Sequence, residues 1–526
     1  VSISFEHLIE SSNKRWTSSN TVKDYKIIVQ EGQCSLAVGA SQVKAMLEAL
    51  ALSDTKIITA GCDGTCFNAP QAIVVDNSGS KHRLTNIALE DISIISKFLN
   101  KVDSSAPYVF SNGQHRLTMD QCVELDSTNI DDYINNGGYK GLAHALMISP
   151  ESVIAETKLS GLRGRGGAYF PAALKWERAR SFKDNSCQLI VNAEEGEPGI
   201  FKDRHLMEGV PHRIIEGMII AAYAANANEA HIYINAEADL SAKRMQTAVT
   251  QAYENGLLGD NILSSGYSLN VIILRGAGGY VCGEETTLIN TMEGYRREPR
   301  LKPPFPTDSG LWGKPTVINN PETLANIPFI MSYGANTYSK IGTEEHKGTK
   351  IVSLTGSVSR PGIIEVPMGT TLRQIIYDLG GGTPPGKTVK AVAIGGPSSG
   401  LLPISKIDTP IKPGFLHESG VMLGSGGIIV LDEDTHLLSV IRKLAFYNSS
   451  ESCGKCTPCR EGTPRMVEAL DKLQSGSDNT ADLENLEYLA KVVNNTSLCG
   501  LGQAAGNPIL SGIHFFKEEL FAPNHI

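Results

Sequence analysis

The sequence predicts an α/β protein made of several successive domains. Its 526 residues exceed what one hydrophobic core usually organises. Strand-like apolar runs alternate with helical patterns in two stretches, residues 24–99 and 187–292. A third stretch combines helical patterns with clustered cysteines. We therefore expect domains at residues 1–105, 127–340, 341–434 and 435–526, with a linker at 106–126.

The N-terminal domain is expected to begin with a loosely packed polar arm, residues 1–22. The elements predicted after it are strands at 26–29, 55–59 and 71–75 and helices at 41–50 and 92–99. This order, together with Cys34 and the segment GCDGTC that holds Cys62 and Cys66, resembles the thioredoxin-like fold of small [2Fe-2S] ferredoxins.

Such ferredoxins usually supply four thiolates, whereas Ser35 stands here where a second thiolate of the first pair is sought. The resemblance makes Cys34, Cys62 and Cys66 candidate ligands of a [2Fe-2S] cluster. Three interpretations stay open: a cluster with an unusual ligand, the fold without its cluster, and cysteines that serve only as small buried hydrophobes.

The second domain shows an alternating helix and strand order, which predicts a Rossmann-like α/β arrangement. The predicted elements are helices at 142–146, 149–156, 213–224 and 286–292 and strands at 187–191, 230–235 and 269–274.

A glycine-rich segment of this domain, GLRGRGGAYFP at residues 161–171, concentrates four glycines and two arginines. Glycine permits φ > 0 and lets backbone N–H groups approach a ligand. Cationic side chains favour an anion at the same place, and Tyr169 and Phe170 can stack on a flat ring. The segment predicts a cradle for a phosphate joined to an aromatic group; the alternative is a basic surface loop.

Three further segments are expected to form the other walls of this pocket. NAEEGEPG (192–199) places acidic and amide side chains after a strand, and RGAGGYVCGEET (275–286) leads into a helix N-terminus, where anions bind. RLKPPFP (300–306) offers a cation and an aromatic ring on a proline-stiffened loop. The paired amides Asn319 and Asn320 follow.

The third domain predicts a β-grasp (ubiquitin-like) arrangement, in which a β-hairpin is crossed by one helix. Strands are expected at 350–354, 363–368 and 389–394, and a helix at 371–379 with Thr370 as its N-cap. We expect this domain to be a structural spacer without chemistry of its own.

The last domain holds the strongest chemical signal, C-x2-C-x2-C with a remote fourth cysteine. Three thiolates on a tight turn and one distant thiolate suit the corners of a [4Fe-4S] cluster, whose candidate ligands are Cys453, Cys456, Cys459 and Cys499. Four-sulfur zinc is the alternative, although zinc sites usually show two separate C-x2-C knuckles. Helices predicted at 465–473 and 481–493 form a small bundle around these cysteines.

Charge and hydropathy restrict the class of partner. A net charge of −9 argues against nucleic acid. We see no signal peptide and no apolar run long enough to span a bilayer, so we expect a cytoplasmic protein without direct membrane insertion.

Taken together, the segments GLRGRGGAYFP, NAEEGEPGIFKDR, RGAGGYVCGEET, RLKPPFP, GLWGKPTVINN and ESCGKCTPCREG resemble the NADH-oxidising, FMN-binding subunit of respiratory complex I. The same module occurs in NAD-linked hydrogenases and formate dehydrogenases. The resemblance extends from about residue 127 to the C-terminus. The N-terminal extension resembles versions found in those other enzymes.

The resemblance implies FMN, NAD(H) and a [4Fe-4S] cluster as cofactors, with FMN at the glycine-rich cradle. The expected FMN-binding residues are Gly164, Arg165, Gly166, Gly167, Lys175, Asn192, Glu194, Glu195, Gly283, Glu284, Asn319 and Asn320. The expected NAD-binding residues are Phe170, Tyr280, Lys302 and Phe305. Glu197 and Glu285 are the candidate catalytic residues, and we expect them to orient ligands rather than to exchange protons.

The implied function is hydride exchange between NAD(H) and FMN, with single electrons passed through the cluster. We expect the electron-input subunit of an NAD-dependent formate dehydrogenase or hydrogenase. The alternatives are a complex I subunit and, from another class, a non-catalytic scaffold. The resemblance also implies a hetero-oligomer with a small [2Fe-2S] thioredoxin-like subunit and a larger iron–sulfur catalytic subunit.

Overall fold

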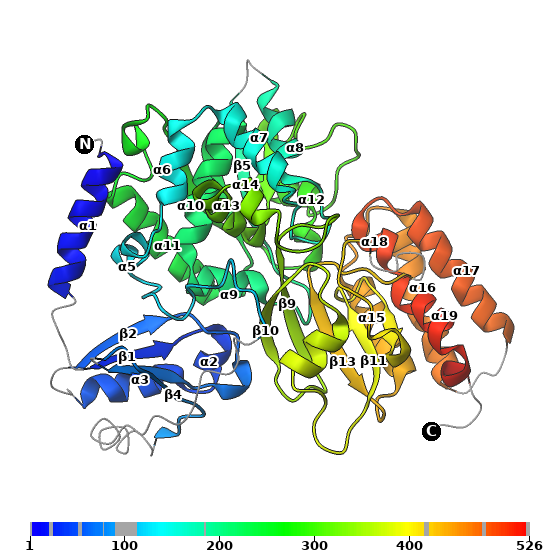
Figure 1. Cartoon of the computed structure of the whole chain (residues 1–526). Coiled ribbons are helices and arrows are strands. Elements are labelled where there is room, and N and C mark those ends of the chain that lie inside the picture. The colour runs from blue at the N-terminus through cyan, green and yellow to red at the C-terminus, as the bar shows by residue number, and fades with distance from the viewer. Residues whose placement is uncertain are drawn as a thin grey trace.

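The computed structural model describes residues 3–19, 25–50, 55–76, 78–89, 113–182, 186–414, 420–475 and 480–521. Within these residues three β-sheets are followed along the chain by a helical bundle (Figure 1). The helix expected at 92–99 lies outside the described residues.

The N-terminal segment is a helix, α1 (Phe5–Ser19), so the expectation of a loosely packed arm is wrong. Arg15 donates to Asp131 at 2.6 and 2.9 Å, and Trp16 Nε1 donates to Asp132 at 2.6 Å. Both acceptors belong to α5 (Ile130–Asn135), beside which α1 lies in Figure 1. A polar segment with little helical signal is thus stabilised by tertiary contacts.

The first sheet has the strand order β2-β1-β3-β4, with β1 parallel to β2 and antiparallel to β3. This mixed sheet confirms the predicted strands of the thioredoxin-like domain. Its elements are β1 (Tyr25–Gln30), α2 (Gln33–Ala37), α3 (Ala40–Ala49), β2 (Thr55–Ala60), β3 (Ala72–Asp76) and β4 (Lys81–Leu84).

The second sheet is entirely parallel and has the order β7-β6-β5-β8. Its strands are β5 (Cys187–Ala193), β6 (Ala227–Ile234), β7 (Asn270–Arg275) and β8 (Thr316–Asn319). Strand β6, the next strand along the chain, pairs with one edge of β5, whereas β8 pairs with the opposite edge of β5. Ligands bind at the carboxyl ends of strands where the strand order reverses in this way.

Helices pack around this parallel sheet, as the alternating pattern predicted. They are α6 (Lys140–Met147), α7 (Pro150–Ser160), α8 (Ala172–Arg180), α9 (Lys202–Gly209), α10 (Pro211–Ala225), α11 (Asp239–Glu254), α12 (Glu285–Met292), α13 (Pro321–Tyr333) and α14 (Ala335–Tyr338). Helix α10 is buried along nearly its whole length, which explains why its pattern is apolar on all sides.

The third sheet has the order β10-β9-β13-β11-β12. Its strands are β9 (Thr349–Gly356), β10 (Gly362–Pro367), β11 (Val389–Ile394), β12 (Leu401–Pro403) and β13 (Gly427–Asp432). The crossing helix ends in a π-helical stretch, Gln374–Leu379. Thr371 Oγ1 accepts from Gln374 N at 3.2 Å, so Thr371 rather than the expected Thr370 stands at the start of this helix.

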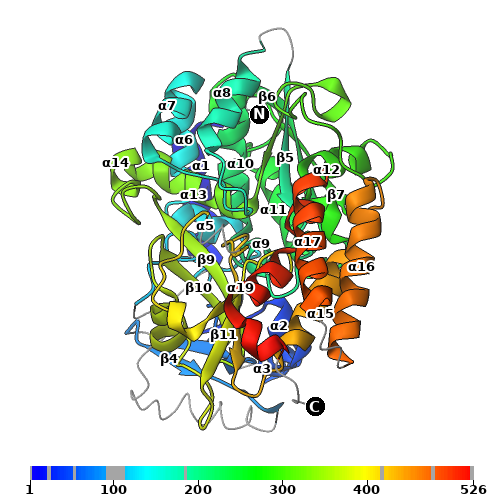
Figure 2. The ribbon, with the colours of Figure 1, turned by 90° about the vertical axis from the view of Figure 1, so that its right-hand side faces the viewer.

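The C-terminal bundle lies at the edge of the molecule, against the third sheet (Figures 1 and 2). It contains α15 (Leu437–Ser450), α16 (Thr457–Gln474), α17 (Thr480–Thr496), α18 (Gly500–Ala504) and α19 (Asn507–Phe521). Helix α16 begins eight residues before the predicted boundary because Pro458 occupies its first turn, where proline is tolerated. No helix among the described residues is both long and apolar enough to cross a bilayer.

Candidate active site

A cavity of about 800 Å³ opens at the carboxyl ends of β5 and β8, at the reversal of strand order. Ligand pockets for small molecules commonly measure about 300–1,000 Å³. All four walls predicted from the sequence meet here. The lining includes Gly164, Gly166, Gly167, Phe170, Lys175, Asn192, Glu194, Glu195, Glu197, Tyr280, Gly283, Glu284, Glu285, Lys302, Phe305, Asn319 and Asn320.

The glycine-rich loop forms one side of the cavity at close quarters. A Cβ on Gly166 would lie 3.1 Å from Asn320 Cβ, at the start of α13. Gly167 has φ of +117°, and a Cβ there would lie 3.4 Å from Gly424 C and Ser425 Oγ. The loop thus needs glycine both for its backbone shape and for its narrow spacing, as expected for a phosphate cradle.

Among the FMN contacts predicted in this loop, Arg165 does not line the cavity, whereas Gly164, Gly166 and Gly167 do. Its guanidinium is buried and donates to Thr349 O at 2.9 Å, Lys347 O at 2.6 Å and Arg163 O at 3.0 Å. Its backbone N–H donates to Thr323 Oγ1 at 2.8 Å. The side chain therefore anchors the loop to the start of β9. Backbone carbonyls accept its hydrogen bonds, in place of the anion that the sequence predicted as its partner.

Three cations among the described residues line the cavity, Lys175, Arg178 and Lys302, and each contacts a carboxylate; Arg178 Nε lies 2.6 Å from Asp308 Oδ1. Lys302 Nζ lies 2.9 Å from Glu284 Oε1 and 2.7 Å from Glu285 Oε1, and Lys175 Nζ lies 3.4 Å from Glu285 Oε2. Burial raises the pKa of Glu285, but the two lysines outweigh it and hold that pKa below its ordinary value. Glu285 is thus ionised at neutral pH and suited to orienting a ligand.

Glu284 and Asn192 have structural partners within the pocket wall. Glu284 is the N-cap of α12, and its Oε2 accepts from Thr286 N and Thr287 N, each at 2.9 Å. Asn192 Nδ2 donates to Gly283 O at 2.9 Å, which joins the second wall to the third. These contacts fix the shape of the wall around the expected flavin.

Three neighbouring carboxyl groups, Glu194, Glu195 and Glu197, have raised pKa values of about 7. Burial is the main cause in each case. Glu195 is held by Asp203 N and Arg204 N, at 2.8 and 3.0 Å. Glu194 Oε1 accepts from Asn235, whereas its buried Oε2 has no hydrogen-bond partner among the described residues. That unpaired oxygen lies against the backbone of the third wall, where a Cβ on Gly276 would clash with it.

We expect the stability of the flavin-free chain to depend on pH through these carboxyls. The folded chain keeps protons up to about pH 7 that the unfolded chain releases near pH 4.5. The free energy of unfolding therefore falls across this range, and Glu194→Gln should gain on the order of 1 kcal/mol relative to the parent chain between pH 5 and pH 8. Urea unfolding measures this gain.

The exposed Glu48 provides the control for this prediction. Glu48→Gln should keep a constant stability difference from the parent chain over the same pH range. Equal pH profiles for the two variants would contradict the assignment of a raised pKa to Glu194.

Two exposed aromatic rings stand at the cavity, as expected for a surface on which a nicotinamide dinucleotide stacks. Phe170 is 50% exposed and Phe305 is 51% exposed, which is unusual for phenylalanine. Tyr280 lies deeper, with its N–H donating to Glu451 Oε2 at 2.7 Å. The open rings and the deeper acidic wall give the cavity an outer and an inner part.

The four C-terminal cysteines line one small cavity beside this pocket, together with Ser452, Lys455 and Pro299. Cys456 precedes α16 and Cys499 precedes α18, so two thiols sit at helix N-termini. No three His, Cys, Asp or Glu residues in the described part of the chain are placed to hold a single metal ion. Four thiols that line one cavity can supply one thiolate to each iron of a [4Fe-4S] cluster.

The cysteine cavity and the large cavity share the side chains of Val281 and Leu501. Val281 belongs to the glycine-rich third wall and Leu501 to α18. A flavin in the large cavity and a cluster at the cysteines would thus be separated by these two apolar side chains.

The N-terminal cysteines also come together. Cys34 Sγ and Cys66 Sγ are 3.6 Å apart, and Cys62 Sγ accepts from Gly64 N at 3.3 Å. The hydroxyl of Ser35 is committed to Gly32 N and to the carbonyl of Gln30. The site offers three thiols, and Ser35 is not free to serve as the fourth ligand.

Helix α9 connects this three-thiol site with the large cavity. Asp203 at its start lines the cavity, while Glu208 at its end accepts from Gln33 N at 3.0 Å. Eight helical residues span about 12 Å. The remaining cysteines, Cys122, Cys187 and Cys282, are buried, and none of them lines the thiol cavity.

The third sheet and the bundle contribute lining residues that the sequence did not indicate. They are Gly395, Ser398, Met422, Gly424, Ser425, Gly500, Leu501 and Ala504. The expectation that residues 341–434 act only as a spacer is therefore wrong, because loops of that unit close the cavity over the glycine-rich segment. Asp203, which the motif NAEEGEPGIFKDR contains, could have been found from its place in that motif.

Three family patterns match the chain. The Nuo51 FMN-binding domain matches residues 157–329, the SLBB domain 351–402, and the iron–sulfur binding region of NADH-ubiquinone oxidoreductase-F 439–522. The matched ranges contain the glycine-rich cradle, most of strands β9 to β12 of the third sheet, and the four C-terminal cysteines.

Similar proteins include two curated relatives and one solved structure. The chain is 47% identical over 406 residues to the NADP-reducing hydrogenase protein HndC of Solidesulfovibrio fructosivorans, covering 77% of this chain and 83% of that protein. It is 42% identical over 398 residues to the NADH-quinone oxidoreductase F-2 subunit of Rhizobium meliloti, covering 76% and 94%. A chain of NAD+-reducing [NiFe]-hydrogenase in the H2-reduced state superposes with a TM-score of 0.69 and 27% identity, over 98% of this chain and 90% of that one.

Proposed function

Because this chain belongs to the family of FMN-binding, NADH-oxidising subunits that includes the F-type subunits of NADH-quinone oxidoreductase, we propose that it is the electron-input subunit of an NAD-linked hydrogenase. The family membership makes it an oxidoreductase subunit that carries FMN and a [4Fe-4S] cluster. Relatives of this kind, among them HndC, are named as subunits of larger enzymes.

We choose a hydrogenase over complex I because a hydrogenase chain matches the structure over nearly the whole of this chain. The NAD+-reducing [NiFe]-hydrogenase chain matches 98% of this chain, the N-terminal sheet included. A domain that precedes the FMN-binding part is thus shared with the hydrogenase chain. The sequence matches to HndC and to the NADH-quinone oxidoreductase F-2 subunit cover similar shares of this chain, 77% and 76%, but the hydrogenase protein HndC is the more similar of the two, at 47% against 42% identity. The domain boundaries that we propose are those expected from the sequence.

The side chains around the large cavity support distinct roles in this activity. FMN, when bound, supplies the conversion between two-electron exchange with NAD(H) and one-electron exchange with an iron–sulfur cluster. We assign the glycine-rich loop, Lys175, Asn319 and Asn320 to its phosphate end, and Glu194, Glu195 and Gly283 to its ring end. Phe170 and Phe305 provide open faces on which the dinucleotide stacks, and the ionised Glu285 with Lys302 orients it.

Proximity and exclusion of water are the main contributions of the protein. Val281 and Leu501 keep water out of the space between the two cavities, and Tyr447 donates to Gly196 O at 2.8 Å to hold the acidic wall in place. No side chain needs to transfer a proton for hydride exchange, so we assign Glu197 and Glu285 to ligand orientation.

The exit for electrons that we propose lies on the surface beside the cysteine cavity. Arg296 Nη2 donates to Cys453 O at 3.4 Å, Arg460 Nη1 donates to Gly454 O at 3.0 Å, and Lys455 is exposed beside them. Glu298 pairs with Arg296 and Lys455, at 3.6 and 3.3 Å, and Glu461 pairs with Arg460 at 2.9 Å, so ion pairs surround the thiol loop. A partner subunit that brings its own iron–sulfur cluster to this charged rim would receive the electrons.

Purification of the full chain with its natural partners tests the proposal. We expect yellow-brown material with flavin and iron–sulfur absorption, hydrogen-dependent reduction of NAD+, and a hydrogenase-type subunit in the complex. The relative HndC is named for NADP, so both coenzymes should be compared. Quinone-reductase subunits in the complex would assign it to complex I instead, a molybdenum subunit would assign it to formate dehydrogenase, and a colourless protein would favour a scaffold.

A further inference from the structure

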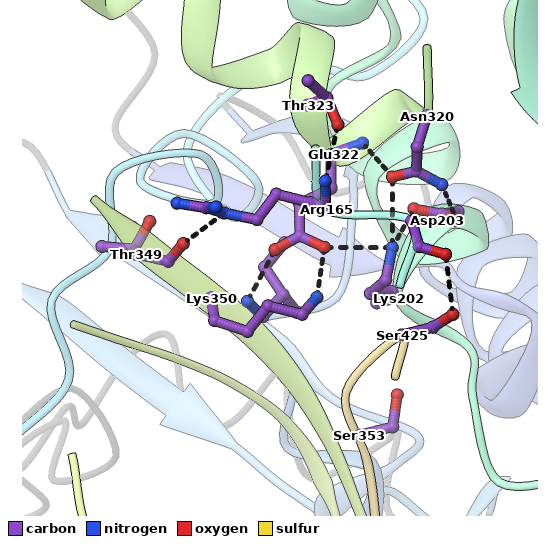
Figure 3. Close-up of polar contacts among 12 residues, drawn as sticks. Arg165, Lys202, Asp203, Asn320, Glu322, Thr323, Thr349, Lys350, Ser353 and Ser425 are labelled. Atoms are coloured by element: carbon purple, nitrogen blue, oxygen red, sulfur yellow. Dashed lines mark hydrogen bonds and ion pairs between the residues drawn. The ribbon is translucent and has the colours of Figure 1, made fainter. Parts of the chain in front are cut away.

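A buried cluster of four charged side chains surrounds Asn320, which lines the cavity (Figure 3). Lys202 Nζ lies 2.6 Å from Asp203 Oδ1 and 3.0 Å from Glu322 Oε2, and Lys350 Nζ lies 2.5 Å from the same Glu322 oxygen. Lys202 and Lys350 are both fully buried. Burying four charges is costly, so such a cluster calls for a role beyond stability.

The cluster holds the side chain of Asn320, which lines the cavity. Asn320 Oδ1 accepts from Lys202 Nζ at 3.3 Å and from Glu322 N at 3.0 Å, and Asn320 Nδ2 donates to Asp203 Oδ2 at 2.6 Å. Both ends of the carboxamide are therefore fixed. Because Asn320 is the N-cap of α13 and packs against Gly166, its orientation sets the width of the glycine cradle.

The two lysines differ in what they reach. Lys202, on α9, contacts Asn320, Asp203 and Glu322, whereas the polar contact that Lys350, on β9, makes among the described residues is with Glu322. Burial lowers the pKa of each lysine, but for Lys202 the attraction of Asp203, Glu322 and Glu195 prevails and raises it. For Lys350 burial prevails and lowers the pKa to about 7. Lys202 thus carries a permanent charge in the cluster.

We propose that Lys202 is a positioning residue for the phosphate of FMN, acting through Asn320. The inference rests on the proposed placement of FMN, with its phosphate at the glycine cradle. The side chain of Lys202 does not line the cavity; it holds the carboxamide of Asn320 and, with Asp203, the first turn of α13. Lys350 pairs with Glu322 and makes no hydrogen bond to the cradle within the part of the chain that the structure describes.

Binding of FMN and of riboflavin to the flavin-free full chain tests this role, because riboflavin lacks only the phosphate. Flavin fluorescence gives both dissociation constants. We expect Lys202→Met to weaken FMN binding about 30-fold and riboflavin binding less than about threefold. The control Lys350→Met removes an equally buried amine from the same glutamate and should change both constants by less than about threefold. Lys202→Arg, which keeps the charge and the donors, should restore most of the FMN affinity.

A second pair of variants guards against loss of folding. Lys202→Met/Glu322→Gln and Lys350→Met/Glu322→Gln each remove one cation and one anion, so the cluster keeps its net charge, and the same selective loss is expected only in the first. Equal effects of the Lys202 and Lys350 variants on FMN and riboflavin would overturn the inference. A parent chain that binds FMN no more tightly than riboflavin would instead overturn the proposed placement of the phosphate.

Discussion

Replacement of Gly166 by valine is expected to remove FMN from the purified chain. A Cβ at this position would lie 3.1 Å from Asn320 Cβ and 3.5 Å from Asn320 Cγ, and valine adds two methyl groups to that contact. Asn320 cannot retreat, because its carboxamide is bonded to Lys202, Asp203 and Glu322. We expect FMN affinity to fall at least about 100-fold, equivalent to about 3 kcal/mol. Flavin content after gel filtration measures it.

The fold should survive this substitution, since Gly166 is exposed in the open cavity and its φ is not in the left-handed region. Gly500→Ala is the matched control: Gly500 lines the same cavity, but a Cβ there meets nothing within 4 Å. This control should keep its flavin. Retention of stoichiometric FMN by Gly166→Val would place the cofactor elsewhere.

Replacement of Cys456 by serine is expected to block electron transfer to the partner subunits while the oxidation of NADH at FMN continues. Serine is a good helix N-cap, so α16 should keep its start while the site loses one thiolate. Without a complete cysteine set the [4Fe-4S] cluster should be lost or unstable. We expect electron transfer from NADH to the partner subunits to fall at least about 100-fold, equivalent to about 3 kcal/mol in the barrier.

Direct reduction of ferricyanide by NADH should persist in this variant, because FMN remains at its own cavity. Iron content and the paramagnetic resonance of the reduced cluster follow the loss directly. Cys187→Ser is the control, since Cys187 lies on β5 outside both cysteine groups and its Sγ donates to Gln188 O at 3.2 Å, a bond that a hydroxyl can keep. Unchanged iron in Cys456→Ser would remove Cys456 from the ligand set.

The local patterns of the chain were sufficient for the elements that carry chemistry. Strands β5, β7, β9 and β11 lie within two residues of their predicted bounds, because each contains a short run rich in apolar and β-branched residues. The glycine spacing of residues 161–167 and the cysteine spacing of residues 453–459 predicted their sites, because backbone freedom and ligand geometry act over a few residues.

Side-chain direction could not be predicted in the same way. Arg165 stands in the glycine loop, yet its guanidinium turns to the carbonyls of residues 347 and 349, which are remote in sequence. Helix α1 follows the same principle, because the acidic partners of Arg15 and Trp16 lie on α5.

The sequence by itself determined which residues can form a phosphate cradle, an acidic wall and a four-cysteine site, since each depends on residue type and short-range spacing. Only the tertiary structure decided that loops of the third sheet close the cavity, that Val281 and Leu501 join the two sites, and that Lys202 stands behind Asn320. Those relations depend on the packing of α9, α13, α18 and the third sheet against one another. Long-range contacts of this kind leave no periodic trace in the segments that make them.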